Sequence, residues 1–264
     1  MKVAVVGAGN LGRLMADRLA EHFDVVAIDK VPEALSRLSN PVVKRSGNID
    51  SIRGCDVVVL CVKPADIPQV LDSMPKDGST LFVSCAAGVP LSKIKSRGIS
   101  RASRVMPNIN IKEGFGVIAF CGEDVSSLFS GIGMCIRMDE DKLNTVTAIS
   151  GSGVAYFWYF ARAFESYALA SGISKAEAGA IIGQVLKGCG EMVLRSGATL
   201  DELIASVATP NGTTAAGLDI LGGKRVDKSI ITALEFTEKR CRDIEKSTGI
   251  VRGRGKGSRH RRTQ

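Results

Sequence analysis

The sequence predicts an α/β fold, a doubly wound sheet followed by an all-α domain. Short apolar and β-branched runs alternate with helical or turn segments up to about residue 137. From residue 139 onward such runs disappear and helical periodicity dominates. A glycine-rich turn directly after the first run is a third indication of this fold. We therefore expect a sheet domain at residues 1–138, a helical domain at 139–250 and a disordered basic tail at 251–264.

The predicted strands of the first domain are short. Val57–Val62 and Leu81–Val83 are apolar at successive positions, which is typical of parallel strands covered by helices on both faces. The full set of predicted strands is Val3–Val6, Val25–Ile28, Val57–Val62, Thr80–Ser84, Arg104–Met106, Gly116–Cys121 and Cys135–Met138.

The second domain is predicted to be helical and to form an interface between subunits. Seven of the 13 aromatic residues lie between Tyr156 and Tyr167, so this helix is apolar nearly all round and should be buried. Small residues in the next helix permit close helix packing. So much apolar surface in about 120 residues predicts a homo-oligomer, at least a dimer. The predicted helices are 140–171, 174–196, 199–207, 214–222 and 228–248.

Composition excludes several classes of protein. With 45% hydrophobic and 23% charged residues, the chain resembles soluble globular proteins. The run Val57–Val62 is far too short to span a bilayer, so no membrane association is expected. The start of the chain has no leader pattern, which predicts a cytoplasmic protein. Seven cysteines without a C-x-x-C pair, and only two histidines, argue against disulfides and a metal site.

The net charge of +8 raises the question of nucleic-acid binding. Six positive charges and no acidic residue lie after residue 250, in the glycine-interleaved tail 251–264. A nucleic-acid-binding domain normally carries its basic patch on the folded part. We therefore interpret the tail as solvated and consider a nucleic-acid partner unlikely, with weak contact to RNA or an anionic surface as the alternative.

The residues Gly7–Gly12 read Gly-Ala-Gly-Asn-Leu-Gly between the first strand and a helical pattern. In this context the glycines allow a tight turn, close approach to a pyrophosphate and packing of the helix on the strand. Asp29 ends the second strand, where an acid can accept hydrogen bonds from an adenosine ribose. Lys30 could instead receive a 2′-phosphate. The sequence thus predicts a Rossmann-like dinucleotide-binding domain, with a purely structural turn as the alternative.

Three further loops are candidates for ligand contacts. Cys61–Pro64 and Val83–Val89 follow strands, at the edge of the sheet where ligands bind in such folds. Lys63 is either catalytic, a neutraliser of charge, or merely solvated. In the helical half, Thr209–Thr214 brings two hydroxyl residues to a helix N-terminus, which favours an anion such as a carboxylate. A plain helix cap is the alternative there.

These segments, together with Arg104–Asn108 (Arg-Val-Met-Pro-Asn) and Ser150–Gly153 (Ser-Gly-Ser-Gly), occur in the order and spacing of the Δ1-pyrroline-5-carboxylate reductases. The chain resembles this family over about residues 1–248. The resemblance implies an oxidoreductase that reduces the cyclic imine Δ1-pyrroline-5-carboxylate to L-proline with NAD(P)H, the last step of proline biosynthesis. It also implies an interlocking helical dimerisation domain and, in some members, rings of dimers.

The motifs and the resemblance together assign the site residues. Thr214 is the expected catalytic residue, whose hydroxyl approaches the ring nitrogen, while Gly212 and Thr213 help to hold the substrate carboxylate. Asp29 should repel a 2′-phosphate, which predicts a preference for NADH over NADPH. The expected cofactor-binding residues are Gly7, Gly9, Asn10, Leu11, Gly12, Asp29, Asn48, Val62, Lys63, Pro64, Ala86, Ala87, Gly88 and Asn108.

The chain departs from the family pattern at three places, and two other functions stay open. Ile109-Asn110 replaces Thr-Pro, Val154 replaces proline, and Thr209–Thr214 replaces Ser-Pro-Gly-Gly-Thr-Thr. The first two departures lie close to where the family binds nicotinamide and substrate. A dehydrogenase of β-hydroxyacids or a related imine reductase is one alternative, and for the former Lys187 would be the acid/base. A non-catalytic NAD(P)-binding regulator is the other.

Overall fold

The computed structural model describes residues 1–247, which fall into two compact units. Of the described residues, the first unit comprises Met1–Gly151 and residues 238–247, and the second comprises Ser152–Thr237. The domain boundaries given above stay a prediction, and the tail 251–264 lies outside the described residues.

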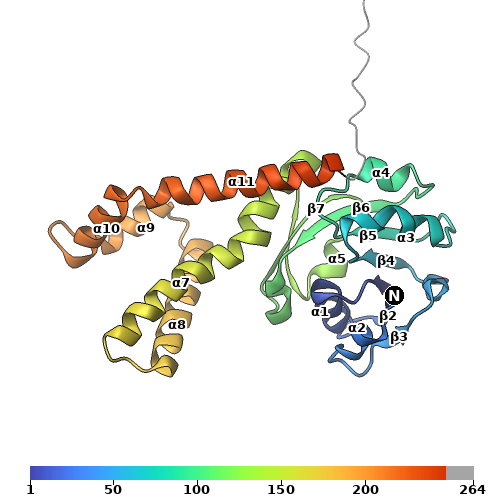
Figure 1. The fold of residues 1–264 in the computed structure, drawn as a ribbon, viewed down its shortest axis with the longest axis horizontal. Helices are drawn as coiled ribbons and strands as arrows, with labels where there is room; N and C mark the ends of the chain where they lie inside the picture. Colours follow the sequence, from blue (N-terminus) through green and yellow to red (C-terminus); the bar gives the residue numbers. More distant parts are fainter. Residues whose placement is uncertain (248–264) are drawn as a thin grey trace, which may run out of the picture. The chain divides into compact units, whose positions relative to one another are not determined.

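The first unit is built on a sheet of eight strands in the order β3-β2-β1-β4-β5-β6-β7-β8 (Figure 1). The first six strands in this order are parallel, β7 is antiparallel to β6, and β8 is parallel to β7. The predicted α/β class is therefore confirmed. The strands are β1 (Lys2–Val6), β2 (Asp24–Ile28), β3 (Lys44–Ser46), β4 (Val57–Leu60), β5 (Leu81–Ser84), β6 (Ala102–Pro107), β7 (Gly116–Gly122) and β8 (Gly133–Arg137).

Apolar layers cover both faces of this sheet, because successive side chains of a strand point to opposite sides. Val5 belongs to the core that includes Met15 of helix α1, whereas Val6 belongs to the opposite core, which includes Ile67 of helix α3. Each such fully buried side chain contributes about 1.5–3 kcal/mol. The helices that lie wholly in this unit are α1 (Asn10–Leu19), α2 (Pro32–Ser36), α3 (Ile67–Ser73), α4 (Leu91–Lys95), α5 (Ser126–Phe129) and α6 (Leu143–Val146), with short 3-10 turns η1 (Ile49–Ile52), η2 (Pro64–Asp66), η3 (Ile109–Glu113) and η4 (Glu140–Lys142).

Strand β3 is absent from the sequence prediction. Its three residues, Lys-Arg-Ser, show no alternation of apolar and polar side chains, and none of them is buried. The strand forms because its backbone pairs in parallel with β2, placing Ser46 beside Ile28 at the edge of the sheet. Lys44 adds an ion pair of 2.7 Å with Asp24.

The predicted helix over 140–171 has the right extent, because the chain is helical from Glu140 to Ala170, but it is not one regular α-helix. The chain instead forms η4, α6, a π-helical turn at Thr147–Ser152 and then α7 (Gly153–Ala170). The Thr147 hydroxyl donates to the Leu143 carbonyl at 2.7 Å, and glycines within Ser150–Gly153 weaken a regular helix. The later helices agree with the prediction to within a few residues: α8 (Lys175–Arg195), α9 (Leu200–Val207), α10 (Thr213–Gly223) and α11 (Val226–Ser247).

The second unit leaves most of its apolar side chains exposed in the single chain. Its helices α7 and α8 pack on each other, and within α7 only Gly153 and Val154 are buried. Phe157 is 65% exposed and Tyr167 is 78% exposed, so one chain alone does not bury the aromatic helix as predicted. A surface of this kind is typical of an interface with another subunit. None of the described helices is long and apolar enough to cross a membrane.

We predict that the purified protein is at least a dimer, because association is the way to remove the aromatic surface of α7 from water. Light scattering at micromolar concentration measures this directly, and a monomeric mass would contradict it. Trp158→Asp, which places a charge on the exposed aromatic surface, should shift the mass toward the monomer. Lys112→Asp, at an exposed position of the first unit, is the control and should not.

Candidate cofactor and substrate sites

The glycine-rich loop joins β1 to α1, and two of its glycines are required by packing. Gly7 has a φ of +96°, and a Cβ there would lie 2.9 Å from the Cys61 carbonyl oxygen. A Cβ at Gly12 would lie 1.8 Å from the Gly7 carbonyl oxygen. At Gly9, by contrast, a Cβ would have no neighbour within 4 Å. Gly9 therefore faces open space, and a ligand such as a pyrophosphate could approach the main chain closely there.

Helix α1 presents an uncapped N-terminus at this open space. Gly9 is the N-cap residue, no side chain caps the helix, and the first turn holds no acidic residue. The main-chain N–H groups at Asn10 and Leu11 belong to this first turn, where a helix has no partners of its own for them. These N–H groups and the positive end of the helix dipole suit a pyrophosphate. The loop therefore fits the dinucleotide predicted from its sequence.

Asp29 holds the glycine loop in place. One carboxylate oxygen accepts from the Ala8 N–H at 2.7 Å, and the other accepts from the Val31 N–H at 2.9 Å. Sequence reasoning expected this carboxylate to bind a ribose and missed these bonds, which link it to the loop itself. Each carboxylate oxygen can accept a further hydrogen bond. The ribose contact thus stays a prediction.

Asn48 lies near Asp29 at the same edge of the sheet. It follows β3, whose Ser46 carbonyl accepts from the Asp29 N–H at 3.1 Å. The Asn48 side chain is exposed, and its oxygen accepts from the Asp50 N–H at 2.9 Å. This arrangement leaves the amide N–H₂ of Asn48 directed to solvent or a ligand.

The segment after β4 places Val62, Lys63 and Pro64 beside the glycine loop. The Val62 side chain lies 2.9 Å from the position of a Cβ on Gly7, and Lys63 is exposed at the start of η2. Cys85 directly follows β5. A hydrogen bond with Cys61 and burial raise the pKa of the Cys85 thiol well above its usual range. Cys85 therefore stays protonated at neutral pH and is a poor nucleophile.

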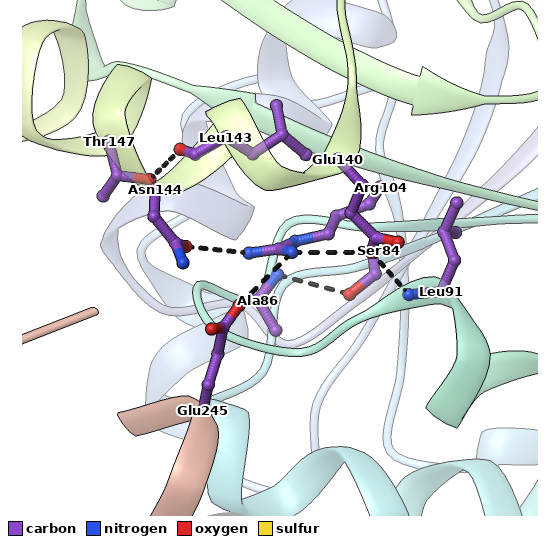
Figure 2. Close-up of polar contacts among 9 residues, drawn as sticks. All are labelled: Ser84, Ala86, Leu91, Arg104, Glu140, Leu143, Asn144, Thr147 and Glu245. Carbon is purple, nitrogen blue, oxygen red and sulfur yellow. Dashed lines mark hydrogen bonds and ion pairs between the residues drawn. The ribbon is translucent and has the colours of Figure 1, made fainter. Parts of the chain in front are cut away.

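The loop after β5 contains Ala86, Ala87 and Gly88 and is fixed from two sides. Gly88 has a φ of +71°, and a Cβ there would lie 3.1 Å from the Glu245 backbone nitrogen in α11. At the other end of the loop, the Leu91 N–H donates to the Glu140 carboxylate at 2.7 Å (Figure 2). Sequence reasoning explained the small residues by a nicotinamide ring, but Gly88 also makes room for α11.

Asn108 is predicted to bind the cofactor, but its side-chain amide forms hydrogen bonds with other residues of the protein. Its side chain is buried, and its amide nitrogen donates to the Ser150 hydroxyl at 3.1 Å. Its oxygen accepts from the Val117 N–H at 3.2 Å and the Asn110 N–H at 3.3 Å. These bonds tie the end of β6 to the Ser150–Gly153 segment. A contact of Asn108 with the cofactor stays a prediction.

In the second unit, the loop before α10 ends in another uncapped helix N-terminus. Gly212 is the N-cap residue and gives no side-chain cap, while Asn211 adopts a φ of +61°. Thr213 and Thr214 are exposed in the first turn, and within residues 1–247 neither hydroxyl has a hydrogen-bond partner. The alternative of a Ser/Thr cap does not describe this helix. The hydroxyls and N–H groups could bind a small anion.

The first unit therefore has the predicted nucleotide-binding residues at the carboxyl ends of β1 to β6, while Gly212–Thr214 belong to the second unit. Lys187, the acid/base of the alternative dehydrogenase, is exposed on α8. In the part of the chain that the structure describes, no three His, Cys, Asp or Glu side chains gather as metal ligands do.

Known proteins match the chain along most of its length. Residues 140–244 match the family model of pyrroline-5-carboxylate reductase dimerisation, and residues 2–88 match that of NADP oxidoreductase, coenzyme F420-dependent. Pyrroline-5-carboxylate reductase 3 of Xenopus laevis is 30% identical, over 92% of this chain and 96% of that protein. The chain belongs to the pyrroline-5-carboxylate reductase family.

Other members of the pyrroline-5-carboxylate reductase family are similar to this chain over a comparable length. Pyrroline-5-carboxylate reductase 2 of Bacillus subtilis is 30% identical, over 92% of this chain and 95% of the relative. The crystal structure of Plasmodium falciparum pyrroline carboxylate reductase with NADP bound superposes with a TM-score of 0.83, covering 93% of this chain and 98% of that one. At 23% identity this structural likeness shows the common fold.

The glycine loop yields a matched pair of variants. Gly12→Ala forces a Cβ against the Gly7 carbonyl and should destabilise the protein by about 3 kcal/mol, the upper part of the range for overpacking. Gly9→Ala has room for its Cβ and a φ of −66°, so thermal unfolding should change little. Its NAD(P)H affinity should nevertheless fall, because the methyl occupies the open space. Equal unfolding temperatures for the two variants would contradict this account.

Proposed function

We propose that this member of the family reduces Δ1-pyrroline-5-carboxylate to L-proline with NAD(P)H, the last step of proline biosynthesis. The likeness to pyrroline-5-carboxylate reductases over 92% of the chain carries the proposal. NAD(P)H, when bound, would supply the hydride for the imine carbon and become NAD(P)⁺, and a proton from water would go to the ring nitrogen. The two uncapped helix N-termini, at α1 and α10, support the assignment, because a dinucleotide and an imino acid each carry an anionic group.

The first unit binds and orients the cofactor in this proposal. The N–H groups of Asn10 and Leu11 hold the pyrophosphate, close to Gly9, where no Cβ obstructs it. Asp29 and Asn48 lie on the adenosine side, at the ends of β2 and β3. The segment Val62–Pro64 and the loop Ala86–Gly88 lie toward the nicotinamide, with Asn108.

The second unit binds the substrate. The N–H group of Thr213 and its neighbours in the first turn hold the carboxylate at the positive end of α10, while Gly212, whose own N–H donates to the Thr209 carbonyl at 2.9 Å, leaves room for it. The Thr214 hydroxyl donates to the ring nitrogen of the imine. Drawing electron density toward nitrogen makes the adjacent carbon more electrophilic. Two contacts of different kinds also fix the orientation of a small ligand.

The proposed function also includes the assembly of the protein and its location in the cell. The match to the dimerisation model and the exposed apolar side chains of the second unit support a homo-oligomer. We propose a dimer as its basic unit, with a ring of dimers as the larger form. The cytoplasmic location stays a prediction from the sequence.

We predict that Thr214→Ala lowers kcat/KM for Δ1-pyrroline-5-carboxylate by roughly 10- to 1000-fold, the range for loss of a polarising or positioning donor. NAD(P)H affinity should barely change, since the glycine loop belongs to another unit. Steady-state kinetics and cofactor titration measure the two quantities.

Thr213→Ala is the control for this experiment. It should cost less, because the main contribution of Thr213 is its backbone N–H, which alanine retains. Full activity in both variants would mean that the loop is only the start of a helix. Loss of cofactor binding in Thr214→Ala would instead place the loop in the cofactor site.

We also predict that NADH is preferred over NADPH, measured as the ratio of kcat/KM values. Hydrogen bonds to the Ala8 and Val31 N–H groups hold the Asp29 carboxylate at the end of β2, where its charge should repel a 2′-phosphate. Exposed Lys30 partly offsets this charge. Lys30→Ala should therefore strengthen the preference. A clear preference for NADPH would contradict the assignment of Asp29 to the ribose.

A further inference from the structure

A buried arginine lies behind the loop that the proposed function assigns to the nicotinamide. Arg104 is on β6 (Figure 2). Its side chain is 1% exposed. A buried guanidinium is costly unless carboxylates and other acceptors surround it. The sequence shows only a cation at the start of the run Arg104–Met106, which alone does not reveal its surroundings.

Three acceptors from two other segments surround this guanidinium. Its Nη1 lies 3.5 Å from Glu140 Oε1 and 3.7 Å from Glu245 Oε1, and its Nη2 donates to Asn144 Oδ1 at 3.3 Å. Glu140 and Asn144 belong to η4 and α6, while Glu245 belongs to the last turns of α11. All these residues lie in the first unit. One cation thus joins β6, the η4–α6 segment and the end of α11.

The loop Cys85–Pro90 is contacted by the Glu140 carboxylate and by the segment of α11 that carries Glu245. Glu140 accepts from the Leu91 N–H at 2.7 Å, directly after the loop. Gly88 packs against the α11 backbone, where a Cβ would lie 3.1 Å from the Glu245 nitrogen and 3.2 Å from the Cys241 carbonyl oxygen. Both contacts of the loop therefore involve a residue, Glu140 or Glu245, whose carboxylate faces Arg104.

We propose that Arg104 is a positioning residue for the cofactor: through Glu140 and Glu245 it holds the loop Cys85–Pro90 in the form that receives the nicotinamide end of NAD(P)H. This inference rests on the proposed assignment of Ala86–Gly88 to the nicotinamide. Lysine cannot replace this arginine, because a single ammonium group lacks the planar fork that faces three acceptors at once. Arg104 itself is buried, so its effect on the cofactor passes through these neighbours.

A positioning role for Arg104 predicts a change in cofactor affinity that a general loss of stability would not produce. NADH contacts both the glycine loop and the loop Cys85–Pro90, whereas ADP-ribose lacks the nicotinamide and requires only the first. Weakening the contacts of Arg104 should therefore lower the affinity for NADH and leave that for ADP-ribose nearly unchanged. Isothermal titration of the full-length protein with each compound gives the ratio of the two affinities.

Glu245→Gln is the principal variant, because it keeps the shape of the side chain and removes its charge. We expect its NADH affinity to fall about tenfold, as for modest misplacement of a binding element. Glu140→Gln and Arg104→Lys should change the ratio in the same direction. Glu238→Gln is the matched control: it makes the same change in α11, where Glu238 pairs with Arg242, and should leave the ratio as in the wild type.

The ratio of the two affinities distinguishes a positioning role for Arg104 from a purely structural one. An unchanged ratio in Glu245→Gln and Arg104→Lys would overturn the positioning role while leaving the proposed reductase activity intact. An equal loss of both affinities would show that the cluster only stabilises the fold, which also overturns it. If the wild type bound NADH no more tightly than ADP-ribose, the assignment of the loop to the nicotinamide would fail, and this inference with it.

Discussion

The close approach of helix α1 to strand β1 is the contact on which the cofactor end of the molecule depends. It is possible only because Gly12 has no side chain at the point where the helix meets the Gly7 carbonyl. This approach directs the N-terminus of α1 to the carboxyl end of the sheet. The same edge carries the ends of β2, β4 and β5, so one steric constraint brings together the segments that we propose for the pyrophosphate, the ribose and the nicotinamide.

Carboxylates hold the loops at this edge in place. Asp29 accepts from the N–H of Ala8 in the glycine loop, and Glu140 accepts from the N–H of Leu91 after the second loop. Hydrogen bonds from backbone N–H groups to an ionised acceptor are shorter and stronger than neutral ones. Both loops thus have a defined shape before any ligand binds, which lowers the entropic cost of binding. Arg104 extends this arrangement by facing Glu140 and Glu245 together.

The second unit combines two tasks in one set of helices. Its aromatic and aliphatic side chains, exposed in the single chain, provide an interface for another subunit. The uncapped start of α10, in the same unit, is the proposed site for the substrate carboxylate. In the proposed function, substrate binding and assembly therefore belong to the same unit. The exposed hydrophobic surface is therefore a functional feature and not only a consequence of composition.

The sequence by itself determined the α/β class, most of the strands, the glycine loop and the helical character of the second half. These features depend on neighbouring residues, through side-chain alternation, helical periodicity and the conformational freedom of glycine. The tertiary structure decided the rest. Strand β3 forms by pairing with β2 and not by its own pattern, and Asn108 bonds Ser150, 42 residues away. The surroundings of Arg104 likewise come from residues 36 and more positions away, so no local pattern could reveal them.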